Sequence, residues 1–359
     1  MAEPDAEERV RELVGYALEK LPSMRLEDGT LCYEVTAPGL APTGSSLRYT
    51  LICLLGLQRA KAAGLEVPID PDELRDLVMD RIDEPEMTPG DLALLMWADS
   101  RAGASRIDAI AFRLHKKLGA ELPDLEGLEL SWLVIGAAEA GAYELCDRAL
   151  ERQLERASAP GRLFTHRDSG RRARFPNFAT QSYGVLALAV AARSGHLTDR
   201  ALTTARRVAG RLLELQRPDG GWPWIFDAKR GTVVEPYEIY SVHQDAMAPM
   251  ALLELSEVTG DAKYLDAAIR GLDWIFGQND LDRKMLDREA GILYRSIRRK
   301  GGFDRALLYA NTATSSVGRA ALSGLRGPLE VNPTDRPYHL GWILEAWAGR
   351  VPASASASS

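Results

Sequence analysis

The stretch from Gln216 to Met250 holds the densest group of side chains that could carry out chemistry: two tryptophans, two tyrosines, one histidine and several carboxylates. His243 and Asp245 stand together at the predicted start of a helix, where an imidazole and a carboxylate could act as general acid and base. Glu238 and Tyr240 come just before them. These four are the candidate catalytic residues, although His243 could instead bond the backbone and Asp245 could cap the helix.

Pro249 follows Asp245 by four residues, which is the spacing of a helical backbone hydrogen bond. If the helix already runs at this point, Pro249 has no N–H to donate and leaves the Asp245 carbonyl free. If the helix begins later, His243 and Asp245 lie in the loop above it. In both cases they lie near a helix N-terminus, where free N–H groups and partial positive charge favour anionic or hydroxylated ligands.

Side chains suited to a sugar occur at the starts of other predicted helices as well. A sugar pocket needs apolar rings for the faces of the sugar and hydrogen-bonding groups for its hydroxyls. The candidate substrate-binding residues are Arg48, Tyr49, His166, Arg167, Asn177, Gln181, Trp222, Trp224, Tyr237, His339 and Trp342. Each could instead be structural, and Trp342 also fits packing between helices.

Two kinds of predicted helix alternate along the chain and must position these residues. Asp199–Gln216 is amphipathic, whereas Asn177–Ser194 is apolar nearly all round and is predicted to be buried on every side. The amphipathic segments, predicted as outer helices, are 5–20, 71–82, 105–119, 143–157, 198–216 and 261–277. The predicted inner helices are 46–63, 90–103, 129–141, 177–195, 242–259 and 336–348.

The predicted links from inner to outer helices are short, whereas most links from outer to inner helices are long: 21–45, 158–176, 217–241 and 278–335. In an alternating ring all the long links emerge on one side, at the N-terminal ends of the inner helices. We expect little β-structure beyond short hairpins in these links. We also expect six side chains to converge on one cavity there: His166, Asn177, Trp224, Tyr237, His243 and His339.

Composition excludes several classes of function. The net charge of −7 argues against nucleic acid as a partner, and the basic patches 167–174 and 295–300 suit solubility or an anionic ligand. The three cysteines give neither a disulfide framework nor a CxxC pair, and no signal peptide or apolar run of about 18 residues occurs. These features predict a cytoplasmic protein. No HExxH, EF-hand, Walker A or GxGxxG pattern is present, so we expect neither a metal nor a cofactor.

The alternation of about six outer–inner pairs resembles the all-α (α/α)6 toroids, with residues 1–350 as one domain and 351–359 as a disordered tail. Two groups share that barrel: the six-hairpin carbohydrate enzymes, and the terpenoid cyclases and prenyltransferases. Gln216-x-x-x-Gly220-x-Trp222 matches the QW motif of the cyclases, in which it braces neighbouring helices. The cyclase DxDD and DDxxD motifs are absent, and Asp280-Leu281-Asp282 is the nearest approach.

We therefore predict a metal-independent, carbohydrate-acting enzyme, either a hydrolase, a lyase or an epimerase, that binds a small sugar or an oligosaccharide. Facing carboxylates among Glu235, Glu238 and Asp245 would indicate a hydrolase. A His–Tyr–Arg cluster would indicate a lyase or an epimerase, with Arg48 or Arg167 neutralising an acidic sugar. The alternatives are a terpenoid cyclase-like toroid and a non-catalytic helical scaffold, and the oligomeric state stays open.

The sequence also suggests how the catalytic candidates should respond to substitution. We expect His243→Ala and Asp245→Asn to abolish turnover. Because residues at the mouth of a ring should touch few core neighbours, we expect each change to cost only about 1 kcal/mol of stability.

Overall fold

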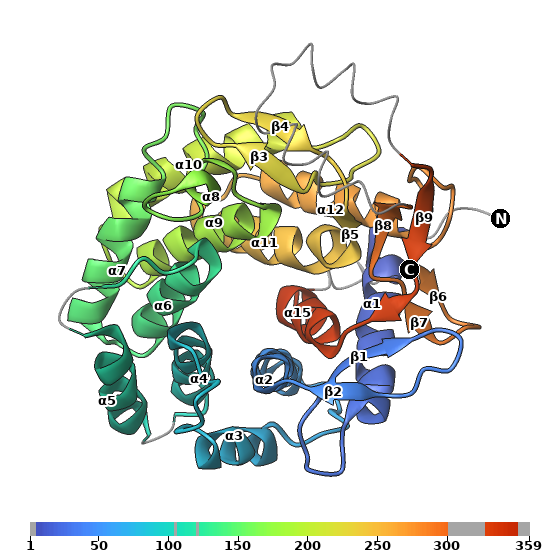
Figure 1. Cartoon of the computed structure of the whole chain (residues 1–359), viewed down its shortest axis with the longest axis horizontal. Coiled ribbons are helices and arrows are strands. Elements are labelled where there is room, and N and C mark those ends of the chain that lie inside the picture. The colour runs from blue at the N-terminus through green and yellow to red at the C-terminus, as the bar shows by residue number, and fades with distance from the viewer. Residues whose placement is uncertain (1–4, 104–105, 120–121, 301–326, 351–359) are drawn as a thin grey trace, which may run out of the picture.

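The computed structural model describes residues 5–103, 106–119, 122–300 and 327–350, so the predicted tail 351–359 lies outside the described residues. The long helices in these ranges form two concentric rings (Figure 1). The outer helices are α1 (Ala6–Lys20), α3 (Pro71–Asp80), α5 (Ile107–Leu118), α7 (Tyr143–Arg156), α10 (Thr198–Leu215) and α12 (Lys263–Ile275). The inner helices are α2 (Leu47–Ala62), α4 (Pro89–Arg101), α6 (Gly127–Glu139), α9 (Phe178–Arg193), α11 (Ala248–Thr259) and α15 (Pro337–Trp347).

Burial separates the two rings as the hydrophobic patterns predict. Every residue of α9 from Phe178 to Ala192 is buried, because its apolar surface meets neighbours on all sides. Every residue from Ala246 to Leu255 is buried as well. The outer helix α10 instead buries a single stripe, formed by Ala201, Ala205, Val208, Ala209 and Leu212. The predicted (α/α)6 arrangement of outer and inner helices is confirmed.

The ring closes where the first inner helix, α2, packs against the last, α15 (Figure 1). Glycines allow the two backbones to touch. A Cβ on Gly56 would lie 2.2 Å from the carbonyl oxygen of Gly341, and a Cβ on Gly341 would lie 2.8 Å from the Cα of Cys53. A larger residue at either position would force the helices apart, so this contact makes the fold a closed barrel and not an open solenoid.

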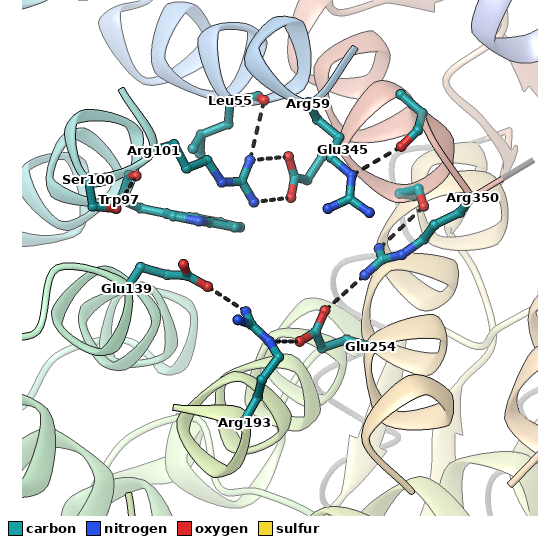
Figure 2. Close-up of polar contacts among 12 residues, drawn as sticks. Leu55, Arg59, Trp97, Ser100, Arg101, Glu139, Arg193, Glu254, Glu345 and Arg350 are labelled. Atoms are coloured by element: carbon teal, nitrogen blue, oxygen red, sulfur yellow. Dashed lines mark hydrogen bonds and ion pairs between the residues drawn. The ribbon is translucent and has the colours of Figure 1, made fainter. Parts of the chain in front are cut away.

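A network of charges joins the C-terminal ends of the inner helices (Figure 2). Arg101 of α4 donates two hydrogen bonds of 2.6 Å to Glu345 of α15. Arg193 of α9 bridges Glu139 of α6 and Glu254 of α11, at 2.6 Å each. Arg350, just beyond α15, donates to Glu254 at 2.8 Å. We call these residues the basal ring: Arg101, Glu139, Arg193, Glu254, Glu345 and Arg350.

Short strands occupy the long links at the opposite end of the barrel. They form two three-stranded sheets, ordered β10-β1-β2 and β5-β8-β9, and the pairs β3-β4 and β6-β7. Their bounds are β1 Cys32–Thr36, β2 Thr43–Ser45, β3 Ile225–Asp227, β4 Thr232–Glu235, β5 Ile239–Tyr240, β6 Leu286–Asp287, β7 Ile292–Leu293, β8 Ser296–Arg299, β9 Leu329–Asn332 and β10 Thr334–Asp335.

The expectation of isolated hairpins needs correction, because strands from different links pair with one another. Val35 of β1 lies opposite Asp335 of β10, and Ile239 of β5 lies opposite Ile297 of β8. Links gathered at one end of a ring come close together, and their backbone N–H and C=O groups need partners. This pairing ties the links into one layer over the N-terminal ends of the inner helices.

Two short helical segments, η1 (Leu21–Met24) and α8 (Arg171–Arg174), complete the described elements of the links. Cys32, Cys53 and Cys146 are buried and unpaired. No helix within the described ranges combines the length and the apolar character that crossing a bilayer would need. A cytoplasmic location stays a prediction.

Candidate active site

His243 and Asp245 lie in a π-helical turn, η2 (His243–Met247), that runs directly into α11. The helix therefore already runs at Pro249, and this proline leaves the Asp245 carbonyl without its usual partner. The indole N–H of Trp347 donates to that carbonyl at 2.6 Å, which binds the turn to α15. The extra residue of a π-turn shifts the side chains that follow it, and such turns occur often at functional sites.

His339 and Asp245 form a buried pair that joins the last inner helix to this turn. Nε2 of His339 lies 2.7 Å from Oδ1 of Asp245, although the two residues are 94 positions apart in sequence. Asp245 is completely buried, and His339 is only 3% exposed. Burial raises the pKa of Asp245, and the charge of His339 and its hydrogen bond oppose this rise. The carboxylate fixes the orientation of the imidazole, as in other acid–imidazole pairs.

His243 lies beside this pair in a largely apolar setting. Its ring centroid is 4.9 Å from that of Phe178 and 5.1 Å from that of Tyr240, and the side chain is 5% exposed. Burial, together with the charges of His339 and Arg295, lowers the pKa of His243 to about 3. The imidazole is therefore neutral near pH 7. Its Nδ1 is buried without a hydrogen-bond partner among the described residues.

Arg295 is a further candidate residue that the sequence analysis did not single out. Its guanidinium lies 5.2 Å above the centre of the Tyr240 ring, and its Nη1 is buried without a partner among the described residues. The amide of Ser241 donates to the Arg295 carbonyl at 2.9 Å, next to the paired strands β5 and β8. These backbone contacts place Arg295 at the site. The basic patch 295–300 was the available signal, but its composition alone did not distinguish a surface from a site.

Glu238 holds Tyr240 in place beneath this arginine. Its carboxylate accepts from the Tyr240 hydroxyl at 3.0 Å and from the Asn332 amide at 3.1 Å, and it also accepts from the Ser296 hydroxyl. Burial, and then the charge of Glu238, raise the pKa of Tyr240, so the phenol keeps its proton. Tyr240 and Arg295 therefore stay fixed beside His243, and Glu238 is a positioning residue in this arrangement.

Arg48 and Tyr49 open α2 at the same end of the barrel. Arg48 donates to Asp91 at 2.6 Å and 3.2 Å and to Glu129 at 3.3 Å. The Tyr49 ring lies 4.7 Å from that of Tyr338, the residue before His339. Because its guanidinium is already bound by two carboxylates, Arg48 does not fit the predicted role of neutralising an acidic sugar.

His166 and Asn177 both contact Thr180, which lies in the first turn of α9. The amide of Thr180 donates to Oδ1 of Asn177 at 3.0 Å, and its hydroxyl lies 2.8 Å from Nδ1 of His166. Burial lowers the pKa of His166 to about 4. Arg167 donates to Glu126 at 2.9 Å, so it too lacks the free charge that an acidic sugar would require.

Four predicted binding residues lie away from this cluster. Tyr237 packs its ring against Arg217 and Arg299, and the convergence of the six residues on one cavity stays a prediction. The Gln181 amide is held by both backbone groups of Phe164, at 2.9 Å each. Trp222 and Trp342 are fully buried core residues, which packing between helices explains.

The segment that matches the QW motif has a bracing role. Nε2 of Gln216, at the end of α10, donates to the carbonyl of Gly220 at 2.9 Å and to that of Ala267 in α12 at 3.0 Å. It thus connects two neighbouring outer helices. The amide of Trp222 donates to Oε1 of Gln244 at 2.7 Å, which fixes the link against the π-turn.

The fold matches solved structures of the (α/α)6 toroid class. A sugar epimerase from a ruminal bacterium superposes with a TM-score of 0.64 at 14% identity, over 96% of this chain and 99% of that one. Cellobiose 2-epimerase from Bacillus thermoamylovorans gives 0.63 at 12% identity, over 95% and 99%. An unsaturated glucuronyl hydrolase specific for heparin gives 0.59 at 15% identity, over 95% of each chain.

At these identities the likeness establishes the architecture alone, which is the (α/α)6 toroid. No family model and no curated protein matches the sequence.

Proposed function

We propose that this chain is a sugar epimerase or isomerase that moves a carbon-bound proton with His243 and His339. The cluster of His243, Tyr240 and Arg295 carries the proposal, since a His–Tyr–Arg cluster is the arrangement expected of proton removal from carbon. The nearby pair of His339 and Asp245 supplies a second imidazole. The fold likeness to a sugar epimerase and to cellobiose 2-epimerase supports the same class.

The reaction begins on the open-chain form of a reducing sugar, whose carbonyl acidifies the C–H of the neighbouring carbon. His243 accepts this proton, since its Nδ1 is buried without a hydrogen-bond partner among the described residues. The electron pair of the C–H bond moves into the carbonyl, and an enediolate forms. Nη1 of Arg295, which has no partner among the residues that the structure describes, can donate to the new oxyanion in buried surroundings where such a contact is strong.

Return of a proton completes the reaction. A protonated His339, held by Asp245, can deliver a proton to the opposite face of the same carbon, which inverts its configuration. Delivery to the former carbonyl carbon, with the proton of the C2 hydroxyl moving to the oxygen on C1, would instead give the isomeric ketose. Either route conserves atoms and electrons and needs no oxidant. The charge of Asp245 stabilises the imidazolium before transfer.

The carboxylates of the site give less support to a hydrolase. Glu238 is occupied by three hydrogen bonds, and Asp245 is bound to His339. Glu235 accepts from the backbone amide of Tyr237 at 3.2 Å. No observation of the described residues favours the terpenoid cyclase alternative, since carboxylates and imidazoles line the site beside the aromatic rings.

An acidic substrate, the finer expectation from sequence, would bind through Arg295. Arg48 and Arg167 are each paired with carboxylates, whereas Arg295 forms no ion pair with a described residue. A uronate carboxylate and an enediolate oxyanion have the same charge, so one guanidinium could serve either group.

Hydrogen exchange tests the proposal directly. The protein is incubated in D2O with glucose, mannose, galacturonate and a panel of disaccharides, and proton NMR follows loss of the signal at C2. We expect exchange at C2, and His243→Asn should slow it about 10²- to 10⁴-fold. His196→Asn is the matched control. His196 is also buried, but it lies in the short link between α9 and α10, where its ring contacts Asp147 of α7. Release of new reducing ends without deuterium uptake would establish a hydrolase and overturn the proposal.

A further inference from the structure

A cleft opens beside the candidate active site, between the N-terminal ends of α2 and α4 and the β1–β2 hairpin. It encloses about 530 Å³, within the roughly 300–1,000 Å³ typical of pockets that bury a small organic ligand. Tyr33, Arg48, Tyr49, Glu84 and Glu86 line it. His243, His339, Tyr240 and Arg295 do not, so the cleft is distinct from the reaction centre.

A row of tyrosines joins the cleft to the reaction centre. The rings of Tyr33 and Tyr49 stack at 5.4 Å, and the ring of Tyr49 lies 4.7 Å from that of Tyr338. Tyr338 directly precedes His339 in α15. The Tyr33 side is the open end of the row, since Tyr33 remains 41% exposed. A ligand with one part at His339 could therefore extend along the row into the cleft.

The charges of the cleft favour a neutral ligand rich in hydroxyl groups. Its two arginines are paired, Arg48 with Asp91 at 2.6 Å and Arg81 with Asp28 at 3.1 Å. Glu84 and Glu86 form no ion pair with a described residue. Unpaired carboxylates repel an anion but accept hydrogen bonds from hydroxyl groups. Aromatic rings beside such acceptors are what a sugar ring requires.

We infer that this cleft binds a second, neutral hexosyl unit, so that the substrate is a disaccharide or a longer oligosaccharide with a free reducing end. The inference rests on the proposed function, which puts the reducing-end sugar between His243 and His339. The next unit then lies along Tyr49 and Tyr33 and donates hydroxyl hydrogen bonds to Glu84. Binding energy from this remote unit can be used at the reacting carbon.

Calorimetry on the His243→Asn protein tests the cleft without turnover. The probes are cellobiose, maltose and mannobiose against glucose and mannose. Disaccharides should bind more tightly than hexoses, and Tyr33→Ala or Glu84→Gln should weaken disaccharide binding about tenfold, the size of one lost contact. Tyr143→Ala, which changes an exposed tyrosine on the outer helix α7, is the matched control and should have no effect.

Kinetics of the active protein separate this inference from the proposed function. In the C2-exchange assay, Tyr33→Ala should lower the ratio of kcat/KM for disaccharide to that for hexose by about the same tenfold factor. Exchange with no preference for disaccharides, and no effect of Tyr33→Ala, would overturn the cleft and leave the proposed function standing. Disaccharide binding that depends on Tyr33 without any C2 exchange would support the cleft and overturn the proposed function. Tighter binding of a digalacturonate than of the neutral disaccharides would overturn the neutral hexosyl unit.

Discussion

The basal ring and the cluster of catalytic candidates at the mouth differ in how their polar groups are paired. At the base, where the inner helices end, Glu139, Glu254 and Glu345 of the basal ring each bind an arginine from another helix (Figure 2). At the mouth, where the inner helices begin, Nδ1 of His243 and Nη1 of Arg295 are buried without a partner among the described residues. The Oδ2 oxygen of Asp245 has none there either.

The difference indicates which of these two clusters serves structure and which is the better candidate for chemistry. A buried polar atom without a partner costs about 1–3 kcal/mol, so a fold retains several together only where something outweighs that cost. Binding of the proposed substrate would be such a gain at the mouth. At the base the arginines neutralise the carbonyl ends of the inner helices and join α15 to α4 and α11, which secures the closure of the ring.

The largest effect should come from His339→Asn, because it removes the second imidazole of the proposed proton transfer. We expect C2 exchange to fall by about 10²- to 10⁴-fold. This change also leaves the Asp245 carboxylate buried without its partner, which should lower the free energy of unfolding by about 3 kcal/mol. The burial of both residues corrects the expectation from sequence that mouth residues touch few core neighbours.

A second variant separates the two effects of that substitution. In His339→Asn combined with Asp245→Asn the buried charge is gone, so denaturant unfolding should return most of the lost stability while exchange stays slow. Exchange that recovers together with stability would mean that the pair is structural and has no part in proton transfer.

Arg295→Met should give the next largest effect. The loss of one donor to an oxyanion commonly lowers the rate by about 10²- to 10³-fold, and we expect a change of that order in kcat. Thermal stability should hardly decrease, because the methionine removes a nitrogen that has no hydrogen-bond partner among the described residues. Arg298→Met, at an arginine paired with Glu330, is the control. Equal rates for the two variants would exclude Arg295 from the reaction.

Arg101→Met should have the opposite signature at the base. It leaves Glu345 buried without its partner, and we expect the free energy of unfolding to fall by about 3 kcal/mol. Activity per folded molecule should persist. Changing Glu345 to Met as well should restore most of the stability in a double-mutant cycle. A loss of C2 exchange by fully folded Arg101→Met protein would contradict the division between base and mouth.

The smallest effect should be a dependence of stability on pH that comes from His166 at the mouth; the basal ring contains no histidine. Burial, and then the charges of Arg172, Arg167 and Arg156, lower the pKa of His166 to about 4, although Glu126 opposes this. The unfolded chain therefore binds a proton first, and His166 costs stability as the pH falls from about 6.5 towards 4.

Urea unfolding at pH 7 and pH 5 measures this contribution of His166. The wild type should lose about 1–2 kcal/mol more than His166→Gln over that interval. Equal losses in the two proteins would show that His166 is protonated when folded.

Several features of the fold and site followed from sequence because they depend on neighbours along the chain. The periodicity distinguished Asn177–Ser194 as buried from Asp199–Gln216 as amphipathic. The lengths of the links predicted which end forms the mouth. Pro249 also predicted that the Asp245 carbonyl would lack its usual helical donor. In the structure the indole N–H of Trp347 donates to this carbonyl instead.

Only the tertiary structure decided which side chains meet. Asp245 pairs with His339 across 94 residues, Arg48 is bound by Asp91, and Arg295 reaches Tyr240 through contacts between strands of different links. The sequence determined that this chain forms helical pairs with polar side chains at one end. Which polar groups found partners depended on the packing of Gly56 against Gly341 and on the rotation of each inner helix about its axis. Both the packing and the rotation are set only when the twelve helices of the barrel come together.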